Sequence, residues 1–222
     1  MTSKERYETV AAQVADACVR AGRSPEEVTV VAVSKTVGPE DVALAIEGGA
    51  HNFGENRPDQ LMLKADQFHD VSWHFIGNIQ SRRIRDIVGR ATLVHSLFEE
   101  RHARKIDEVA RDRGIVQDVL LEVNVSGEQS KSGLQPANVR AMLETCAALS
   151  NVRVRGLMTM APLGDFTAAR SAFAGLRNLR DELQPAFPDL VELSMGMTDD
   201  WPIAIEEGAT IVRIGRAIFR AR

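Results

Sequence analysis

The stretch Val28-Thr29-Val30-Val31-Ala32-Val33-Ser34-Lys35 is an apolar, β-branched run, and Gly38-Pro39-Glu40-Asp41 opens a helix soon after it. A strand buried on both faces has this continuous apolar character, and proline at the first helical position is typical of a helix start. The pattern therefore predicts a buried strand that leads directly into a crossover helix. It also places the amine of Lys35 at the carboxyl end of that strand.

The same alternation of strand and helix patterns continues along the chain. We expect strands near 28–34, 50–53, 72–76, 92–95, 118–124, 152–158, 190–194 and 210–214. We expect helices near 39–48, 56–69, 80–88, 99–113, 136–148, 166–184 and 199–207. Strict alternation of strands with crossover helices favours parallel pairing, and this number of strands favours closure. The predicted fold is α/β, a single (β/α)8 barrel of the TIM type.

The chain reads as one domain over residues 1–222, without a linker or a low-complexity stretch. The segment after the last predicted strand, 217–222, is too short for a full helix. An extra N-terminal helix within residues 1–22 carries Val10, Val14 and Cys18 on one face. We expect this helix to pack on the barrel where a helix after the last strand would lie.

Composition and charge reduce the number of function classes that fit the chain. The chain has 222 residues and a formal net charge of -4, which gives no electrostatic reason to expect nucleic-acid binding. Its cysteines, Cys18 and Cys146, fall on apolar helical positions and fit buried thiols of a reducing compartment. No apolar stretch is long enough for a signal sequence or a membrane span. The expected location is the cytoplasm.

In a barrel of this kind, functional residues lie at the carboxyl ends of the strands, and phosphate is often held after strands seven and eight. Ser194, Gly196 and Gly215 stand at those two places and suit an anion site. The Thr198-Asp199-Asp200 stretch is expected to begin a helix whose positive end faces the same place. The alternative is that these residues form tight turns without a ligand.

Lys35 follows the first predicted strand at the same rim. A buried, desolvated lysine loses its proton more easily than a surface lysine, and its neutral amine can form a Schiff base with an aldehyde. The alternative is a lysine that marks where the strand leaves the core and reaches solvent. A lysine and an anion site on one rim together indicate a ligand site more specifically than either feature alone.

A set of motifs spans nearly the whole chain. They are Val31-Ala32-Val33-Ser34-Lys35-Thr36, Phe53-Gly54-Glu55-Asn56, Trp73-His74-Phe75-Ile76-Gly77 with Gln80, Glu128-Gln129-Ser130-Lys131-Ser132-Gly133, Gly156-Leu157-Met158, Leu193-Ser194-Met195-Gly196-Met197-Thr198-Asp199-Asp200 and Val212-Arg213-Ile214-Gly215. In these motifs and in their order the chain resembles the pyridoxal phosphate homeostasis proteins, single barrels related to the barrel domain of alanine racemases.

The resemblance implies that Lys35 carries pyridoxal 5′-phosphate (PLP) as a Schiff base. It further implies that Ser194, Gly196 and Gly215 surround the phosphate, and that Arg213 faces the pyridine nitrogen.

The resemblance also implies that Asn56 lies near the cofactor ring, whereas His74 either contacts the cofactor or packs in the core. The chain departs from the family pattern at Arg82-Arg83, where the family has Asn-Lys, and at Arg216, where the family commonly has threonine. Arg216 therefore either replaces a hydroxyl contact to the phosphate with a charge or points away from it.

Arg213 bears on catalysis, because a guanidinium only donates hydrogen bonds and keeps its proton. A pyridine nitrogen that faces it stays unprotonated, and such a ring is a poorer electron sink. In the alanine racemases that the chain resembles, a tyrosine from an additional β domain serves as second base. The only tyrosine of this sequence is Tyr7, in the N-terminal helix.

The expected function is therefore PLP binding and intracellular PLP (vitamin B6) homeostasis, in which the protein buffers the cofactor or delivers it to PLP-dependent apo-enzymes. We expect a monomer or weak dimer. The alternatives are a PLP-dependent racemase or related weak enzyme, a cofactor-independent Schiff-base aldolase, and an interaction module. The segment Glu128-Gln129-Ser130-Lys131-Ser132-Gly133 is a lid, a docking surface or a simple turn, and Lys131 is a candidate second transfer amine.

Overall fold

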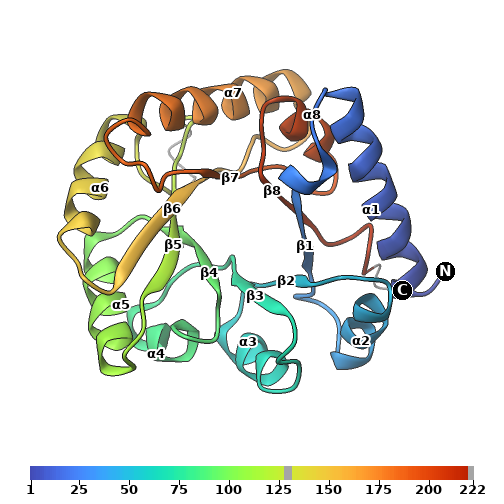
Figure 1. Cartoon of the computed structure of the whole chain (residues 1–222), viewed down its shortest axis with the longest axis horizontal. Helices are drawn as coiled ribbons and strands as arrows, with labels where there is room; N and C mark the ends of the chain where they lie inside the picture. The colour runs from blue at the N-terminus through green and yellow to red at the C-terminus, as the bar shows by residue number, and fades with distance from the viewer. Residues whose placement is uncertain (128–131, 220–222) are drawn as a thin grey trace.

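The computed structural model describes residues 1–127 and 132–219. Its strands form a closed barrel in which every neighbouring pair is parallel, β1 closing against β8 (Figure 1). In chain order the strands are β1 (Thr29–Val33), β2 (Asn52–Glu55), β3 (Ser72–Phe75), β4 (Leu93–Leu97), β5 (Gln117–Glu122), β6 (Val152–Met158), β7 (Glu192–Ser194) and β8 (Ile211–Ile214). The predicted (β/α)8 barrel is confirmed.

Helices surround the barrel on its outer side (Figure 1). They are α1 (Ser3–Arg20), α2 (Pro39–Glu47), α3 (Pro58–Ala65), α4 (Ile84–Ile87), α5 (Glu100–Asp112), α6 (Val139–Ala147), α7 (Phe166–Leu183) and α8 (Trp201–Glu206). Short 3₁₀ helices, η1 (Pro25–Glu27), η2 (Ser81–Arg83) and η3 (Pro136–Asn138), precede β1, α4 and α6. None of the helices in the described part of the chain is long and apolar enough to cross a membrane.

Several predicted element boundaries were wrong. The strand expected at 50–53 lies at Asn52–Glu55, because the loop that begins at Gly48 passes through Gly49, at φ +92°, before pairing starts. The helix expected from 80 to 88 is a 3₁₀ turn followed by a single helical turn. The helix expected to begin at 199 begins at Trp201, after a turn over 198–200.

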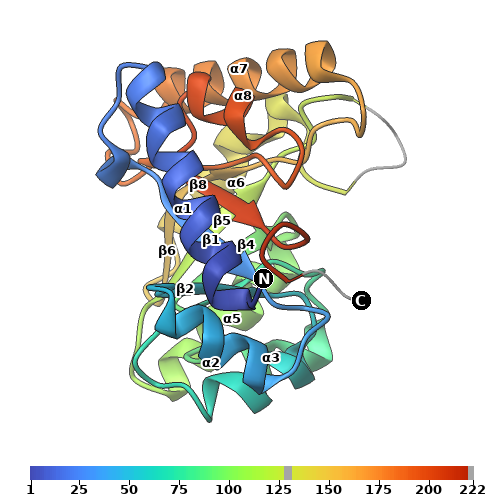
Figure 2. The same cartoon turned by 90° about the vertical axis from the view of Figure 1, so that its right-hand side faces the viewer.

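Helix α1 packs against α2 and α8 and crosses outside β1 (Figure 2). A capping box starts the helix: Thr2 Oγ1 accepts from the Glu5 amide, and the Glu5 carboxylate accepts from the Thr2 amide. Tyr7, Val10 and Val14 are buried beneath it. The extra N-terminal helix thus lies where it was expected and closes the outer ring beside β8.

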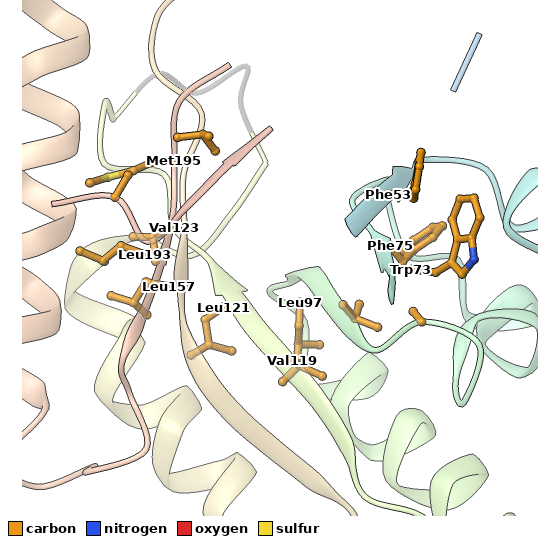
Figure 3. Packing of buried hydrophobic residues seen from close by; sticks show 14 of the residues in the cluster. Phe53, Trp73, Phe75, Leu97, Val119, Leu121, Val123, Leu157, Leu193 and Met195 are labelled. Atoms are coloured by element: carbon orange, nitrogen blue, oxygen red, sulfur yellow. The ribbon is translucent and has the colours of Figure 1, made fainter. Parts of the chain in front are cut away.

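Two apolar layers hold the barrel together. The larger one lies between the strands and the helices, where Phe53 and Trp73 pack with ring centroids 5.4 Å apart on β2 and β3 (Figure 3). A smaller cluster joins residues from strands on opposite sides of the barrel, so it fills the interior. Its members are Val31, Val33, Leu93, Leu120, Met158 and Ile211. The interior is therefore a packed core whose polar groups need partners of their own.

Candidate functional site

Parallel strands in a closed barrel bring all their carboxyl ends to one rim. Lys35 and Asn56 follow β1 and β2, Ser194 ends β7, and Gly215 follows β8. The pairing of Ala32 with Ile214 sets the end of β1 directly beside the end of β8. The sequence-predicted residues therefore share one end of the molecule, as expected.

The expectation of a buried, desolvated Lys35 was wrong. Strand β1 ends at Val33, and Lys35 lies in the turn that follows, where its side chain is exposed. The wall of the barrel stops before this residue, so nothing in the apolar interior encloses the amine. The Lys35 amine is instead accessible to solutes.

Among the described residues the fully buried lysine is Lys64, on α3. Its Nζ lies 2.5 Å from Glu55 Oε1 and donates to the Ser34 carbonyl at 2.8 Å. Ser34 Oγ also donates to Glu55 Oε1 at 2.7 Å. This buried cluster of three residues ties the end of β1 to β2 and α3 and so anchors the residue that precedes Lys35.

Sequence reasoning missed Lys64. A usable signal was present, because Lys64 stands three residues after Leu61 and next to Ala65, on the apolar stripe of α3. A charged residue on such a stripe is buried with a partner, and Glu55 at the end of the preceding strand supplies it.

Arg213 is buried in the barrel and makes two hydrogen bonds, one to β7 and one to the residue that follows β6. Its Nη1 donates to Ser194 Oγ at 2.6 Å and its Nη2 to the Thr159 carbonyl at 3.0 Å. Burial lowers the pKa of Arg213 to about 10, against the opposing effect of the Asp200 and Glu122 carboxylates. The guanidinium therefore remains charged near neutral pH, and it can only donate hydrogen bonds.

Two buried histidines continue the hydrogen bonding from Ser194. Ser194 Oγ lies 2.8 Å from His95 Nδ1, and His95 Nε2 lies 2.8 Å from His74 Nδ1. His74 Nε2 then contacts Asn52 Oδ1 at 3.1 Å. His74, for which a cofactor contact and a core position were both open, is thus a hydrogen-bonded core residue. His95 lies within β4, which extends to Leu97 and so beyond the strand expected at 92–95.

Burial lowers the pKa of both rings. The pKa of His74 falls from 6.5 to about 4. That of His95 falls well below its ordinary value through burial, with further repulsion from His74 and Arg213. Both imidazoles are therefore neutral near neutral pH.

We expect stability to fall as the pH drops from 6.5 toward 4. Within this window His74 takes up a proton in the unfolded chain. It does not do so in the folded protein, where the pKa of His74 is about 4. The loss from this residue alone amounts to about 3 kcal/mol. Urea unfolding across this range measures it. His74→Phe should flatten the dependence, whereas exposed His69→Phe should leave it unchanged. A slope in His74→Phe equal to that of the wild type would contradict the assignment.

The turn after β7 requires glycine at one position. Gly196 has φ +88°, and a Cβ there would lie 2.6 Å from the Ala204 Cβ. The Met197 amide donates to Asp200 Oδ1 at 2.5 Å and holds the turn closed. Gly215, in the neighbouring loop, sits close to Val33, whose carbonyl oxygen would be 3.3 Å from an added Cβ.

Two predicted residues lie at the edges of this rim. Asn56 is exposed, and its backbone packs so closely on Gly77 that a Cβ at residue 77 would be 2.0 Å from the Asn56 carbonyl oxygen. Arg216 is exposed, pairs with Asp199 and lines an open groove of about 670 Å³ between α1 and the β7–α8 turn. Among the described residues, the hydrogen bonds join Arg213 to Ser194 but not to Lys35.

The model of the family described as alanine racemase, N-terminal domain, matches residues 10–222. A pyridoxal phosphate homeostasis protein of Aquifex aeolicus is 42% identical over an alignment that covers 100% of this chain and 99% of the relative. The chain belongs to the pyridoxal phosphate homeostasis protein family. Another member, from Escherichia coli K12, is 37% identical and is matched over 95% of this chain and 92% of its own length.

A solved structure of PipY from Synechococcus elongatus PCC7942, with PLP bound, is similar at a TM-score of 0.82 and 34% identity, covering 93% of this chain and 99% of PipY. An alanine racemase of Clostridium difficile 630 has a TM-score of 0.75 at 16% identity and covers 89% of this chain and 56% of the racemase. The racemase comparison concerns the fold alone. The resemblance expected from the motifs, and the family to which it pointed, are confirmed.

The roles of Lys35, Asn56, Ser194, Gly196, Arg213, Gly215 and Arg216 toward a cofactor stay predictions. Part of the loop expected at 128–133, residues 128–131 with Lys131, lies outside the described residues.

Proposed function

We propose that this protein binds PLP at the carboxyl rim of its barrel and serves in PLP homeostasis, as one domain over residues 1–222 and as a monomer or weak dimer. The proposal rests on one observation. Lys35, an accessible amine, lies at the same end of the molecule as the buried Arg213 guanidinium and the Gly196 turn. Full-length similarity to proteins named for PLP homeostasis, and to PipY with PLP bound, supports it.

The residues at the rim fit the chemical groups of PLP. The cofactor supplies an aldehyde, which condenses with a neutral amine to a C=N bond with loss of one water. Lys35 is the accessible amine. Arg213 offers N–H donors to a pyridine nitrogen, which accepts them when it carries no proton.

For the phosphate we propose the backbone amides of the two turns after β7 and β8, at Gly196 and Gly215, beside Ser194, whose hydroxyl contacts Arg213 and His95. Glycine lets backbone amides approach an anion, and these two turns adjoin at the rim because β7 and β8 pair. Arg216 lies in the same loop as Gly215 and adds a positive charge near it, although its present partner is Asp199. We assign Asn56, at the end of β2, to the side of the ring.

We propose that the protein holds the cofactor and does not turn over amino acids. A ring nitrogen that faces Arg213 stays unprotonated, which weakens the ring as an electron sink. Tyr7, the only tyrosine of the sequence, is buried in α1. It lines a groove beside Thr29 and Asn52, the first residues of β1 and β2, and so lies at the end of the barrel opposite Lys35. No tyrosine of this sequence is therefore placed to move a proton at the site.

Exposure of Lys35 favours a reversible store of cofactor. Lys35 lies in an exposed turn. An amine in solution, or one carried by an apo-enzyme, can therefore approach the cofactor carbon that would be bonded to Lys35. We therefore propose PLP-dependent apo-enzymes as recipients. The cytoplasm is the proposed location, since its reducing conditions suit the two buried free thiols Cys18 and Cys146.

The loaded protein, freed of unbound PLP, should restore the activity of an added PLP-dependent apo-enzyme. The same loaded protein, incubated with amino acids in deuterated water, should leave their Cα protons in place. Free PLP at the same concentration is the control for both readings. Rapid Cα exchange catalysed by the loaded protein would make it an enzyme and contradict the proposal, as would retention of all PLP in the presence of the apo-enzyme.

A further inference from the structure

A hydrogen-bonded relay crosses the inside of the barrel from Asn52, in β2, to Arg213, in β8. Its links run through His74, His95 and Ser194, which come from β3, β4 and β7. His95 and Ser194 are fully buried, and His74 and Arg213 are 5% exposed. Water therefore has little access to these groups, so each donor and acceptor depends on its neighbours in the relay.

The chemistry of the two ends sets the direction of every bond. Arginine only donates, so Ser194 Oγ accepts from Arg213. At the other end Asn52 Oδ1 accepts from His74 Nε2. A neutral imidazole has one donor and one acceptor nitrogen, so His74 Nδ1 accepts from His95 Nε2. His95 Nδ1 is then the acceptor for the Ser194 hydroxyl. All four bonds point toward Asn52, and only Arg213 carries a charge.

This direction commits the Ser194 proton to His95 and turns a lone pair of its oxygen to Arg213. We propose that His95 and His74 are positioning residues, which hold Ser194 as an acceptor and thereby fix the orientation of the Arg213 guanidinium. The inference rests on the proposed function, in which Arg213 faces the cofactor's pyridine nitrogen. It adds that the orientation of Arg213 is set from the far side of the barrel.

Two anchors define the guanidinium, Ser194 Oγ at Nη1 and the Thr159 carbonyl at Nη2. Removal of the first anchor leaves one hydrogen bond about which the group can turn. The carboxylates of Glu122 and Asp200 are close enough to affect the charge of Arg213, so they would draw it away. A ring nitrogen that loses its donor becomes free to take up a proton.

The first test needs no cofactor. Nitrogen NMR of the ¹⁵N-histidine-labelled protein near neutral pH should show His74 and His95 as neutral rings protonated at Nε2. The exposed His51 and His69 serve as internal references. Ser194→Ala should change the signature of His95 and leave the references unchanged. A His95 ring protonated at Nδ1, or a cationic ring, would overturn the relay.

The second test compares PLP-loaded wild type, His95→Phe and His95→Gln by absorbance titration of the pyridine nitrogen. His95→Phe should raise the pKa of that nitrogen and weaken PLP binding by about tenfold, because Ser194 loses the acceptor for its proton. His95→Gln should restore wild-type behaviour, since one amide both accepts and donates. Circular dichroism and cooperative unfolding establish that each variant is folded.

A folded His95→Phe variant that loads and titrates like the wild type would overturn this inference and leave the proposed function standing. Failure of the wild type to take up PLP would overturn both. The two failures are therefore distinguishable in one set of samples.

Discussion

Replacement of Lys35 by alanine should abolish covalent capture of PLP. The wild-type protein, mixed with PLP, should develop the visible absorbance of a lysine-bound cofactor, and Lys35→Ala should not. Lys35→Arg should behave like Lys35→Ala, because a guanidinium keeps its charge but does not condense with an aldehyde. Both variants should fold normally, since the side chain is exposed in a turn.

Lys4→Ala is the matched control, because Lys4 lies on α1 and not at the end of a strand. This variant should retain the full wild-type absorbance. A Lys35→Ala protein with an undiminished visible band at full stoichiometry would show that another amine holds the cofactor.

Replacement of Lys64 by methionine should be the most destabilising single change considered. The substitution leaves the Glu55 carboxylate buried without its cation, and breaking a buried pair in this way costs about 3–5 kcal/mol. For a chain of this size the expected fall in Tm is roughly 10 °C. Thermal unfolding followed by circular dichroism measures it. Because the cluster anchors Ser34, capture of PLP at Lys35 should also slow in the folded variant.

Two controls separate the buried charge from general effects of substitution. Glu55→Leu combined with Lys64→Met removes both charges and should recover most of the lost stability. Lys105→Ala removes one partner of the Lys105–Glu108 pair at the surface and should cost less than about 1 kcal/mol. A Tm of Lys64→Met within a degree or two of the wild type would contradict the role assigned to the buried pair.

The alternation of strands and helices could be predicted from sequence because each barrel unit carries its own local signals. The β1 run and the Pro39 helix start are examples, and both lie where the pattern placed them. Boundaries were less predictable where backbone geometry, such as the positive φ of Gly49 or the 3₁₀ turn over Ser81–Arg83, delays the start of a strand or helix. The start of β2 at Asn52 and the single turn of α4 are the main cases.

The site was only partly predictable, for a physical reason. Residues at strand ends are recognised by their place in the chain, which is how Lys35 and Ser194 were found. Partners across the barrel have no such signal, since His95 and Ser194 are 99 residues apart in sequence and 2.8 Å apart in space. The burial of Lys64 and the exposure of Lys35 depend on where a helix packs and where a wall ends. The exposure of Lys35 is not a property of one local stretch, whereas the burial of Lys64 has a local signal in its place on the apolar stripe of α3.

We propose that one amine of this chain, that of Lys35, holds PLP. The most direct measurement is borohydride reduction of the wild-type protein incubated with PLP, followed by peptide mass spectrometry. We expect one reduced cofactor per chain, located on the peptide that contains Lys35. Label on Lys131, or label spread over the surface lysines with Lys35 unmodified, would contradict it.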